Sequence, residues 1–192
     1  MKTDRSKRLP APNPTPPFAG LLARLAEERG YRRWESGGLW VRQRPRFLHV
    51  VGPDVKRIGG GDPLLDFGIW VPELVAVVKG SPTDLHDADD CHIVPFALHV
   101  DPLEPSAGAI RRVLDAADQM QTLEDVYRYL EGDFPRRWPP GGGLRHLYLA
   151  ALALLLGSPD VYWESEAACK QLAGTPWYDA ACHIYAMVAT RE

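Results

Sequence analysis

The sequence lacks three features that are typical of membrane or secreted proteins. Its longest apolar run, 147–156, is ten residues long, whereas a helix that crosses a bilayer needs about 20. It has only 3 cysteines, an odd number, so a framework of disulfides is not expected in a chain of 192 residues. After the basic N-terminus the chain continues as PAPNPTPP, where a signal peptide would be apolar. We therefore expect a cytoplasmic protein with no membrane partner.

An excess of positive charge is also missing. The formal net charge is -3 and the sequence pI is about 6.1, whereas nucleic-acid-binding domains usually present a basic face and a high pI. Nucleic acid is therefore not an expected partner. Residues 1–17 hold five prolines, four basic residues and one acid, so we expect a disordered tail. The remaining 18–192 then carry a net charge of -6, and we expect them to form a single α+β domain.

The N-terminal half of this domain has the pattern of one helix followed by strands. Apolar residues recur every three or four positions over 18–29, and Gly30 follows them, which predicts a helix. Four short runs rich in aromatic or β-branched residues predict an antiparallel meander of about four to five strands. The first four strands are expected at 31–34, 39–43, 47–51 and 64–71. Prolines then punctuate 72–105, where we expect loop except for a short strand at 91–94.

The C-terminal half has helical spacing. Ile110, Val113, Leu114 and Ala117 form one apolar stripe. Thr122 followed by Asp125 resembles a helix-start signature for a helix at 123–130, although the motif prefers Glu or Gln at its last position. A further helix is predicted at 144–156, and Pro159 and Pro176 occur where first helical turns tolerate proline.

The densest polar cluster of the sequence is the segment 84–92. Four aspartates fall within 84–90, and His86, Cys91 and His92 complete the ligand types that transition-metal sites use. The spacing matches no zinc or calcium motif, because adjacent ligands on an extended segment point in opposite directions. We expect no metal and no cofactor. The alternatives are a binding surface for a basic partner or an acidic loop that leads into a strand with Cys91 or His92 in the core. The candidate binding residues are Asp87, Asp89, Asp90, Cys91 and His92.

Other cysteines and histidines lie on the predicted C-terminal helices. Cys182 and His183 are adjacent, with Asp179 on the same helical face as His183. Cys169 and His146 belong to other helices, so a composite site could form only in three dimensions. The alternative is that Cys182, which lies among apolar residues, is a small buried side chain. No local signature of a catalytic nucleophile and no phosphate-binding loop is present, so no catalytic residue is assigned.

Three segments resemble a known family. They are the helix and hairpin of 18–40 with its Leu39-Trp40-Val41-Arg42, the run 61–72 that ends in proline, and the Asp90-Cys91-His92-Ile93 signature. Together they span about 18–138 and resemble domain of unknown function 4304, an uncharacterised bacterial family. The resemblance implies a bacterial α+β domain with no assigned activity. Small acidic bacterial domains of this kind are often suspected of being immunity proteins in toxin loci.

Three classes of function remain open from the sequence. The first is a non-catalytic interaction protein, for instance an immunity-type inhibitor, whose negative surface meets a basic partner. The second is a small metal-dependent or Cys/His hydrolase built on Cys91, His92 and neighbouring aspartates. The third is a small-ligand-binding module with a pocket lined by some of the 6 tryptophans. The oligomeric state cannot be read from the sequence.

Overall fold

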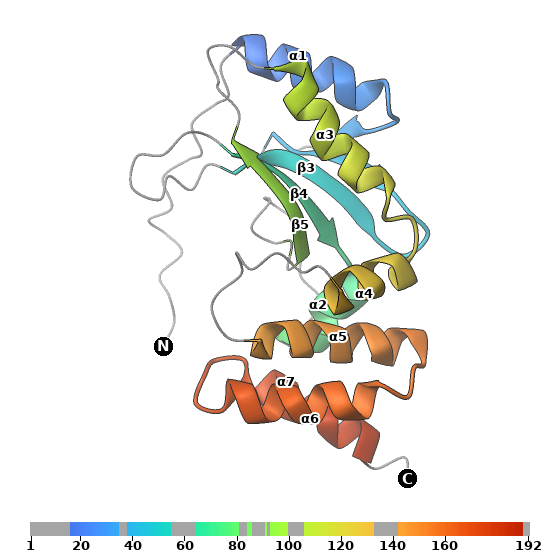
Figure 1. Ribbon diagram of the computed structural model, residues 1–192, viewed down its shortest axis with the longest axis vertical. Coiled ribbons are helices and arrows are strands. Elements are labelled where there is room, and N and C mark those ends of the chain that lie inside the picture. Colours follow the sequence, from blue (N-terminus) through green and yellow to red (C-terminus); the bar gives the residue numbers. More distant parts are fainter. Residues whose placement is uncertain are drawn as a thin grey trace.

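The computed structural model describes residues 16–34, 38–54, 64–80, 84–85, 91, 93–99, 106–132 and 142–189. It has an N-terminal helix, an antiparallel sheet and a helical C-terminal half, which confirms the predicted α+β class (Figure 1). Most of the predicted disordered tail lies outside the described residues, whose first helix begins at Pro16. In chain order the elements are α1 (Pro16–Glu27), β1 (Arg32–Arg33), β2 (Trp40–Gln43), β3 (Leu48–Asp54), β4 (Leu64–Trp70), α2 (Pro72–Lys79), β5 (Ile93–His99), α3 (Ala107–Asp118), α4 (Leu123–Glu131), α5 (Gly143–Leu156), α6 (Val161–Leu172) and α7 (Tyr178–Ala189).

The five strands pair in sequence order, β1-β2-β3-β4-β5, and every pair is antiparallel. The register places Trp40 opposite Val51 and Val51 opposite Phe67, so these three side chains form a row across the sheet. All three are buried in the main core. Because successive residues of a strand point to opposite faces, the neighbouring Val41 and Val50 lie on the other face.

Helices α1 and α3 cover the first face of the sheet (Figure 1). The stripe predicted for α3 is fully buried there, since Ile110, Val113, Leu114 and Ala117 are each 0% exposed. The second face carries a smaller apolar cluster of Leu39, Val41, Leu48, Val50, Leu85 and Cys91. The indole Nε1 of Trp34 donates to the carbonyl oxygen of Leu85 at 3.0 Å. This bond ties the segment after α2 to the start of the meander.

The expectation of loop after Pro72 is wrong for α2. Proline lacks an N–H, but the first turn of a helix does not use that donor, and Pro72 is the first helical residue after Val71. The helix ends at Gly80, whose φ of 71° is a left-handed conformation that suits glycine. Leu74, Val75 and Val78 are its buried side chains.

Strand β5 is longer than the predicted 91–94, because it extends to His99 through Pro95. Among the strands that the structure describes, it pairs only with β4 and is therefore an edge strand. An edge strand tolerates proline, since one of its sides makes no ladder hydrogen bonds.

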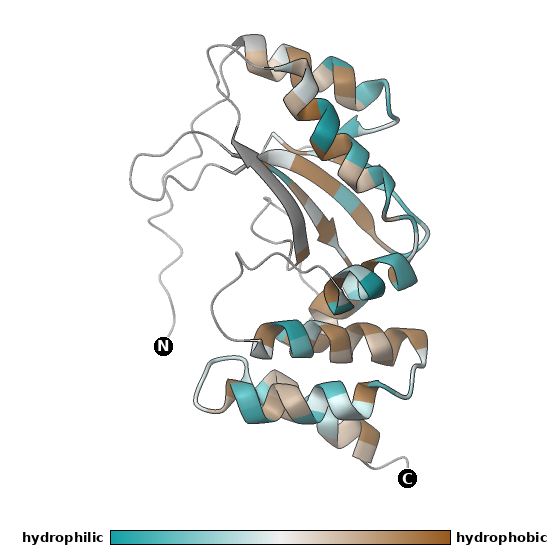
Figure 2. Ribbon diagram, in the orientation of Figure 1, coloured by the Kyte–Doolittle hydropathy of each residue, from teal (hydrophilic) through white to brown (hydrophobic). Residues whose placement is uncertain are grey.

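Helix α5 is the centre of the C-terminal half. It packs against α2, α4, α6 and α7, and α2 also contacts α7 (Figure 1). Figure 2 shows that apolar residues surround most of its circumference. Every residue of 147–153 is at most 1% exposed, as expected for a helix that is covered all round. Gly143 lets α5 approach α6 closely, since a Cβ there would lie 2.7 Å from a methyl carbon of Leu172. Within the described ranges, no helix has both the length and the apolar composition needed to cross a bilayer.

Candidate functional site

The candidate binding segment is described only at a few positions. Asp87, Asp89, Asp90 and His92 lie outside the described residues, so their role stays a prediction. Cys91 is 2% exposed and belongs to the apolar cluster on the second face of the sheet. A Cβ added to Gly68 would lie 2.8 Å from its sulfur, so the thiol packs directly on β4. A thiol enclosed in this way is inaccessible to a large substrate.

On the C-terminal helices, the two cysteines contact each other, and His146 pairs with a glutamate. The Sγ atoms of Cys169 on α6 and Cys182 on α7 are 3.6 Å apart. His146 on α5 lies instead beside Glu164 on α6, with 2.6 Å between Nδ1 and Oε2. His183 is exposed. Among the residues that the structure describes, no three His, Cys, Asp or Glu side chains are grouped so that they could hold a metal ion.

The Cys169 thiol is protonated at neutral pH. Burial raises the pKa of the Cys169 thiol to about 11, and its hydrogen bond with Cys182 acts in the same direction. The Tyr178 hydroxyl is hydrogen-bonded to Cys182, which raises the pKa of that phenol. Both cysteines are half-buried, and the structure contains no disulfide between them.

The outer surface of α6 and α7 exposes two large aromatic side chains. Trp163 is 67% exposed and Tyr178 is 40% exposed. Trp163 is the third residue of α6 and Tyr178 the first of α7, so they lie at opposite ends of the two packed helices. The segment 158–189 contains four acids and one lysine, a formal net charge of -3. This part of the molecule therefore combines aromatic and acidic character.

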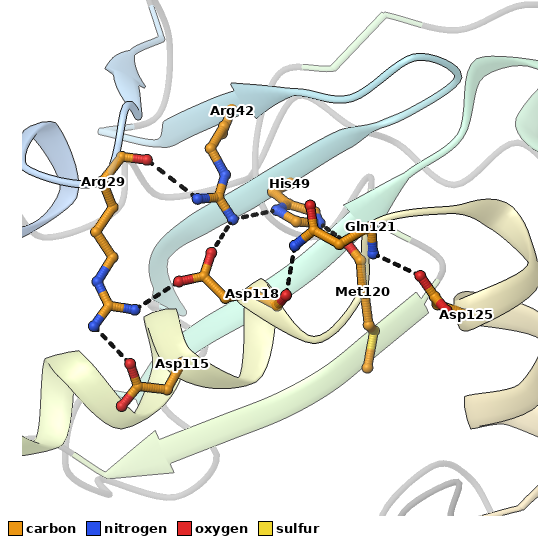
Figure 3. A network of polar contacts seen from close by, with 8 residues as sticks. All are labelled: Arg29, Arg42, His49, Asp115, Asp118, Met120, Gln121 and Asp125. Carbon is orange, nitrogen blue, oxygen red and sulfur yellow. Dashed lines mark hydrogen bonds and ion pairs between the residues drawn. The ribbon is translucent and has the colours of Figure 1, made fainter.

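A second polar arrangement, which the sequence did not reveal, lies between the sheet and α3 (Figure 3). The guanidinium of Arg42 on β2 donates from Nη1 to the carbonyl oxygen of Arg29 and from Nη2 to Nδ1 of His49, both at 3.1 Å. The same Nη2 pairs with Asp118 at the end of α3. Arg29 contacts Asp118 at 2.8 Å and Asp115 at 2.6 Å.

We call Arg29, Arg42, His49, Asp115 and Asp118 the α3 polar network. Burial alone would raise the pKa of Asp118, but the hydrogen bond and charge of Arg42 outweigh it and lower that pKa. The Arg42 guanidinium also stacks on Tyr31, with its carbon 4.7 Å from the ring centroid. The network joins the ends of α1 and α3 to the β2-β3 hairpin.

His49 is the buried member of this network and is 0% exposed. Because Arg42 can only donate, Nδ1 of His49 accepts, and Nε2 carries the proton that it donates to the carbonyl oxygen of Met120 at 2.6 Å. Burial lowers the pKa of His49 to about 3, and the charge of Arg42 also lowers it. The ring is therefore neutral at pH 7 and serves as a fixed acceptor and donor.

One feature of the sequence could have predicted that His49 points into the core face of the sheet. In the run Leu48-His49-Val50-Val51, the alternation of a strand puts His49 on the same face as Val51. The partners Arg29, Arg42 and Asp118 come from distant segments and leave no local pattern.

Comparisons of the chain with protein-family models, curated proteins and solved structures found no match.

Proposed function

We propose that this protein is a non-catalytic interaction protein that binds a basic protein partner through the outer surface of α6 and α7. The observation that carries this proposal is the 67% exposure of Trp163. Tryptophan and tyrosine are enriched among the residues that dominate binding energy, because they bury a large apolar area and lose few rotamers. Exposed tryptophan and tyrosine side chains, such as Trp163 and Tyr178, are typical of anchor residues.

The charge of this surface defines the chemistry of the partner. Asp160 and Asp179 are exposed, and Glu164 and Glu166 are half-buried, with only Lys170 of opposite charge in the same two helices and their connections. A basic partner would gain attraction over distances comparable to the Debye length, about 8 Å at physiological salt, which accelerates association. The predicted acidic segment with Asp87, Asp89 and Asp90 would also attract a basic partner.

The finer proposal is an immunity-type inhibitor of a bacterial toxin. It rests on the acidic composition and on the resemblance to domain of unknown function 4304. An inhibitor of this kind needs a stable scaffold and an exposed surface, without catalytic groups of its own.

The test compares surface variants against a partner purified from the source cells with the full-length protein as bait. Trp163→Ala should raise the dissociation constant at least about tenfold, the effect expected for an anchor residue. Asp179→Asn should slow association, with a difference that shrinks at high salt. The matched control is Glu27→Gln, which removes an exposed acid from α1 and should change neither quantity. An acidic partner, or equal affinity of the Trp163→Ala variant, would contradict the proposal.

A small hydrolase is the second candidate, and the pairing of His146 with Glu164 is the observation that favours it. A carboxylate on Nδ1 leaves Nε2 as an oriented base, as in catalytic triads. It ranks second because nearby nucleophilic atoms are engaged elsewhere. The Ser165 hydroxyl is buried and donates to the carbonyl oxygen of Tyr162 at 3.0 Å, and the Cys169 thiol is hydrogen-bonded to that of Cys182.

A further inference from the structure

Helices α6 and α7 pack side by side and meet through pairs of like residues. The hydroxyl groups of Tyr162 and Tyr185 are 3.3 Å apart, and further along the same interface the thiols of Cys169 and Cys182 are in contact. We propose that Cys169 and Cys182 are a redox pair that closes reversibly into a disulfide joining α6 to α7, with a glutathione-type small disulfide as the oxidant. This proposal is independent of the proposed function.

The geometry is close to that of a disulfide. The Sγ atoms are 3.6 Å apart, so forming a bond of about 2.05 Å requires them to approach by roughly 1.5 Å. The residue before each cysteine, Ala168 or Ala181, is 0% exposed, so each cysteine follows a buried position of its helix.

The two thiols are also accessible, unlike the third. Cys169 and Cys182 are half-buried, whereas Cys91 is 2% exposed on the other side of the sheet from the main core. A small disulfide can therefore reach the pair on α6 and α7. Cys91 provides an internal control that should remain reduced.

The reaction is two successive thiol–disulfide exchanges. One cysteine, as its thiolate, attacks oxidised glutathione, which forms a mixed disulfide and releases one glutathione thiolate. The second cysteine, as its thiolate, attacks the protein sulfur of that mixed disulfide and releases the second glutathione. The protein loses two electrons and two protons, and one oxidised glutathione becomes two reduced molecules. Because burial raises the pKa of Cys169, little thiolate is present at neutral pH and the exchange should accelerate as the pH rises.

The disulfide would constrain the least anchored helix of the C-terminal half. Only two of the twelve residues of α7, Ala181 and Ile184, are buried. A bond from its middle to α6 would hold α7 in place while it lasts. Because Tyr178 is the first residue of α7, one turn before Cys182, the bond would also restrict movement of this end of the helix.

The experiment equilibrates the reduced, full-length protein in glutathione buffers of increasing oxidised fraction and then blocks free thiols. The expected result is that two of the 3 thiols become resistant to the blocking reagent together, because they are oxidised, whereas the third still reacts with it. Trypsin cuts after Arg145, Lys170 and Arg191, so the bond should appear as peptide 146–170 linked to peptide 171–191. Reduced glutathione should reverse the link, and hydrogen exchange of α7 amides should slow several-fold in the oxidised protein.

Two variants serve as controls. Cys182→Ser should lose the linked peptides, whereas Cys91→Ala should keep them. Failure of the link to form at any glutathione ratio, a link that includes Cys91, or a link between two molecules would overturn the proposal. The wild-type peptide map decides these outcomes even if a variant does not fold.

Discussion

His49 connects two distant parts of the chain through one neutral ring. One nitrogen accepts from Arg42 on the neighbouring strand and the other donates to Met120 after α3. A protonated ring could not accept from Arg42, because both nitrogens would then be donors. The hydrogen bond that His49 accepts from Arg42 therefore requires the His49 ring to stay neutral.

This dependence predicts how stability varies with pH. The pKa of His49 is about 3 in the folded protein and near 6.5 in the unfolded chain, so only the unfolded chain binds a proton between these values. The free energy of unfolding should therefore fall as the pH is lowered through this window, by up to about 1.4 kcal/mol per pH unit. Denaturant unfolding at pH 7, 6 and 5 measures how the free energy of unfolding changes with pH. These values lie above the pH range in which Asp118 titrates.

The variant His49→Gln should flatten this slope by about one proton, because its amide does not titrate. Gln43→Ala, which changes an exposed side chain that carries no titrating proton, is the control and should leave the slope nearly as in wild type. Equal slopes for wild type and His49→Gln would show that His49 does not titrate abnormally.

At the scale of the elements, the start of α4 shows a reciprocal cap. The Thr122 hydroxyl oxygen accepts from the backbone N–H of Asp125 at 3.2 Å, and the Asp125 carboxylate accepts from the backbone N–H of Thr122 at 2.9 Å. The sequence pattern predicted this start, and the shorter aspartate completes the box as glutamate would. The same carboxylate also accepts from the N–H of Gln121 at 3.0 Å.

Removing this cap should have a measurable effect. Thr122→Ala should lower the free energy of unfolding by about 1 kcal/mol, because the Asp125 N–H loses its acceptor. Ser106→Ala is the matched comparison, since Ser106 caps α3 through a longer 3.4 Å contact and should lose less. Urea unfolding of both variants measures the difference. A larger loss for Ser106→Ala would contradict this ranking of the two caps.

The meander and the C-terminal helices could be predicted because each carries its own periodicity and punctuation. Helix α2 was missed because Pro72 was interpreted as a breaker, whereas it is the first residue of the helix. The length of β5 was missed because Pro95 does not disrupt an edge strand. In both cases the effect of proline depended on its place in the helix or sheet, which only the tertiary structure shows.

The candidate sites show the same limit. Cys169, Cys182 and His146 were visible as isolated residues, but which of them meet depends on how α5, α6 and α7 pack. His146 contacts Glu164, and the two cysteines contact each other. The exposure of Trp163 was equally invisible, because its neighbours in sequence do not show which face of α6 is covered.

At the scale of the molecule, one apolar core links the two halves. The main cluster contains Phe67 of β4, Leu74 of α2 and Leu147 of α5, and it continues through α6 to Ile184 of α7. A polar contact reinforces this connection. Arg46 in the β2-β3 turn donates to the carbonyl oxygen of Leu155 in α5 at 3.2 Å.

A shared core predicts a shared unfolding transition. Leu147→Ala on α5 should lower the unfolding free energy by about 2–5 kcal/mol, and hydrogen exchange should show the same loss for amides of β4 and of α5. Arg24→Ala, an exposed change on α1, should leave both sets nearly unchanged. A loss confined to the α5 amides would show that the helical half unfolds separately.

The short edge strand β1 has a consequence for the protein at high concentration. A sheet edge can recruit a strand from another copy and so begin an aggregate. Here strand β1 is only two residues long, and both Arg32 and Arg33 are exposed. Two copies aligned along this edge would bring four guanidinium groups together, so their mutual repulsion opposes growth of the sheet through β1.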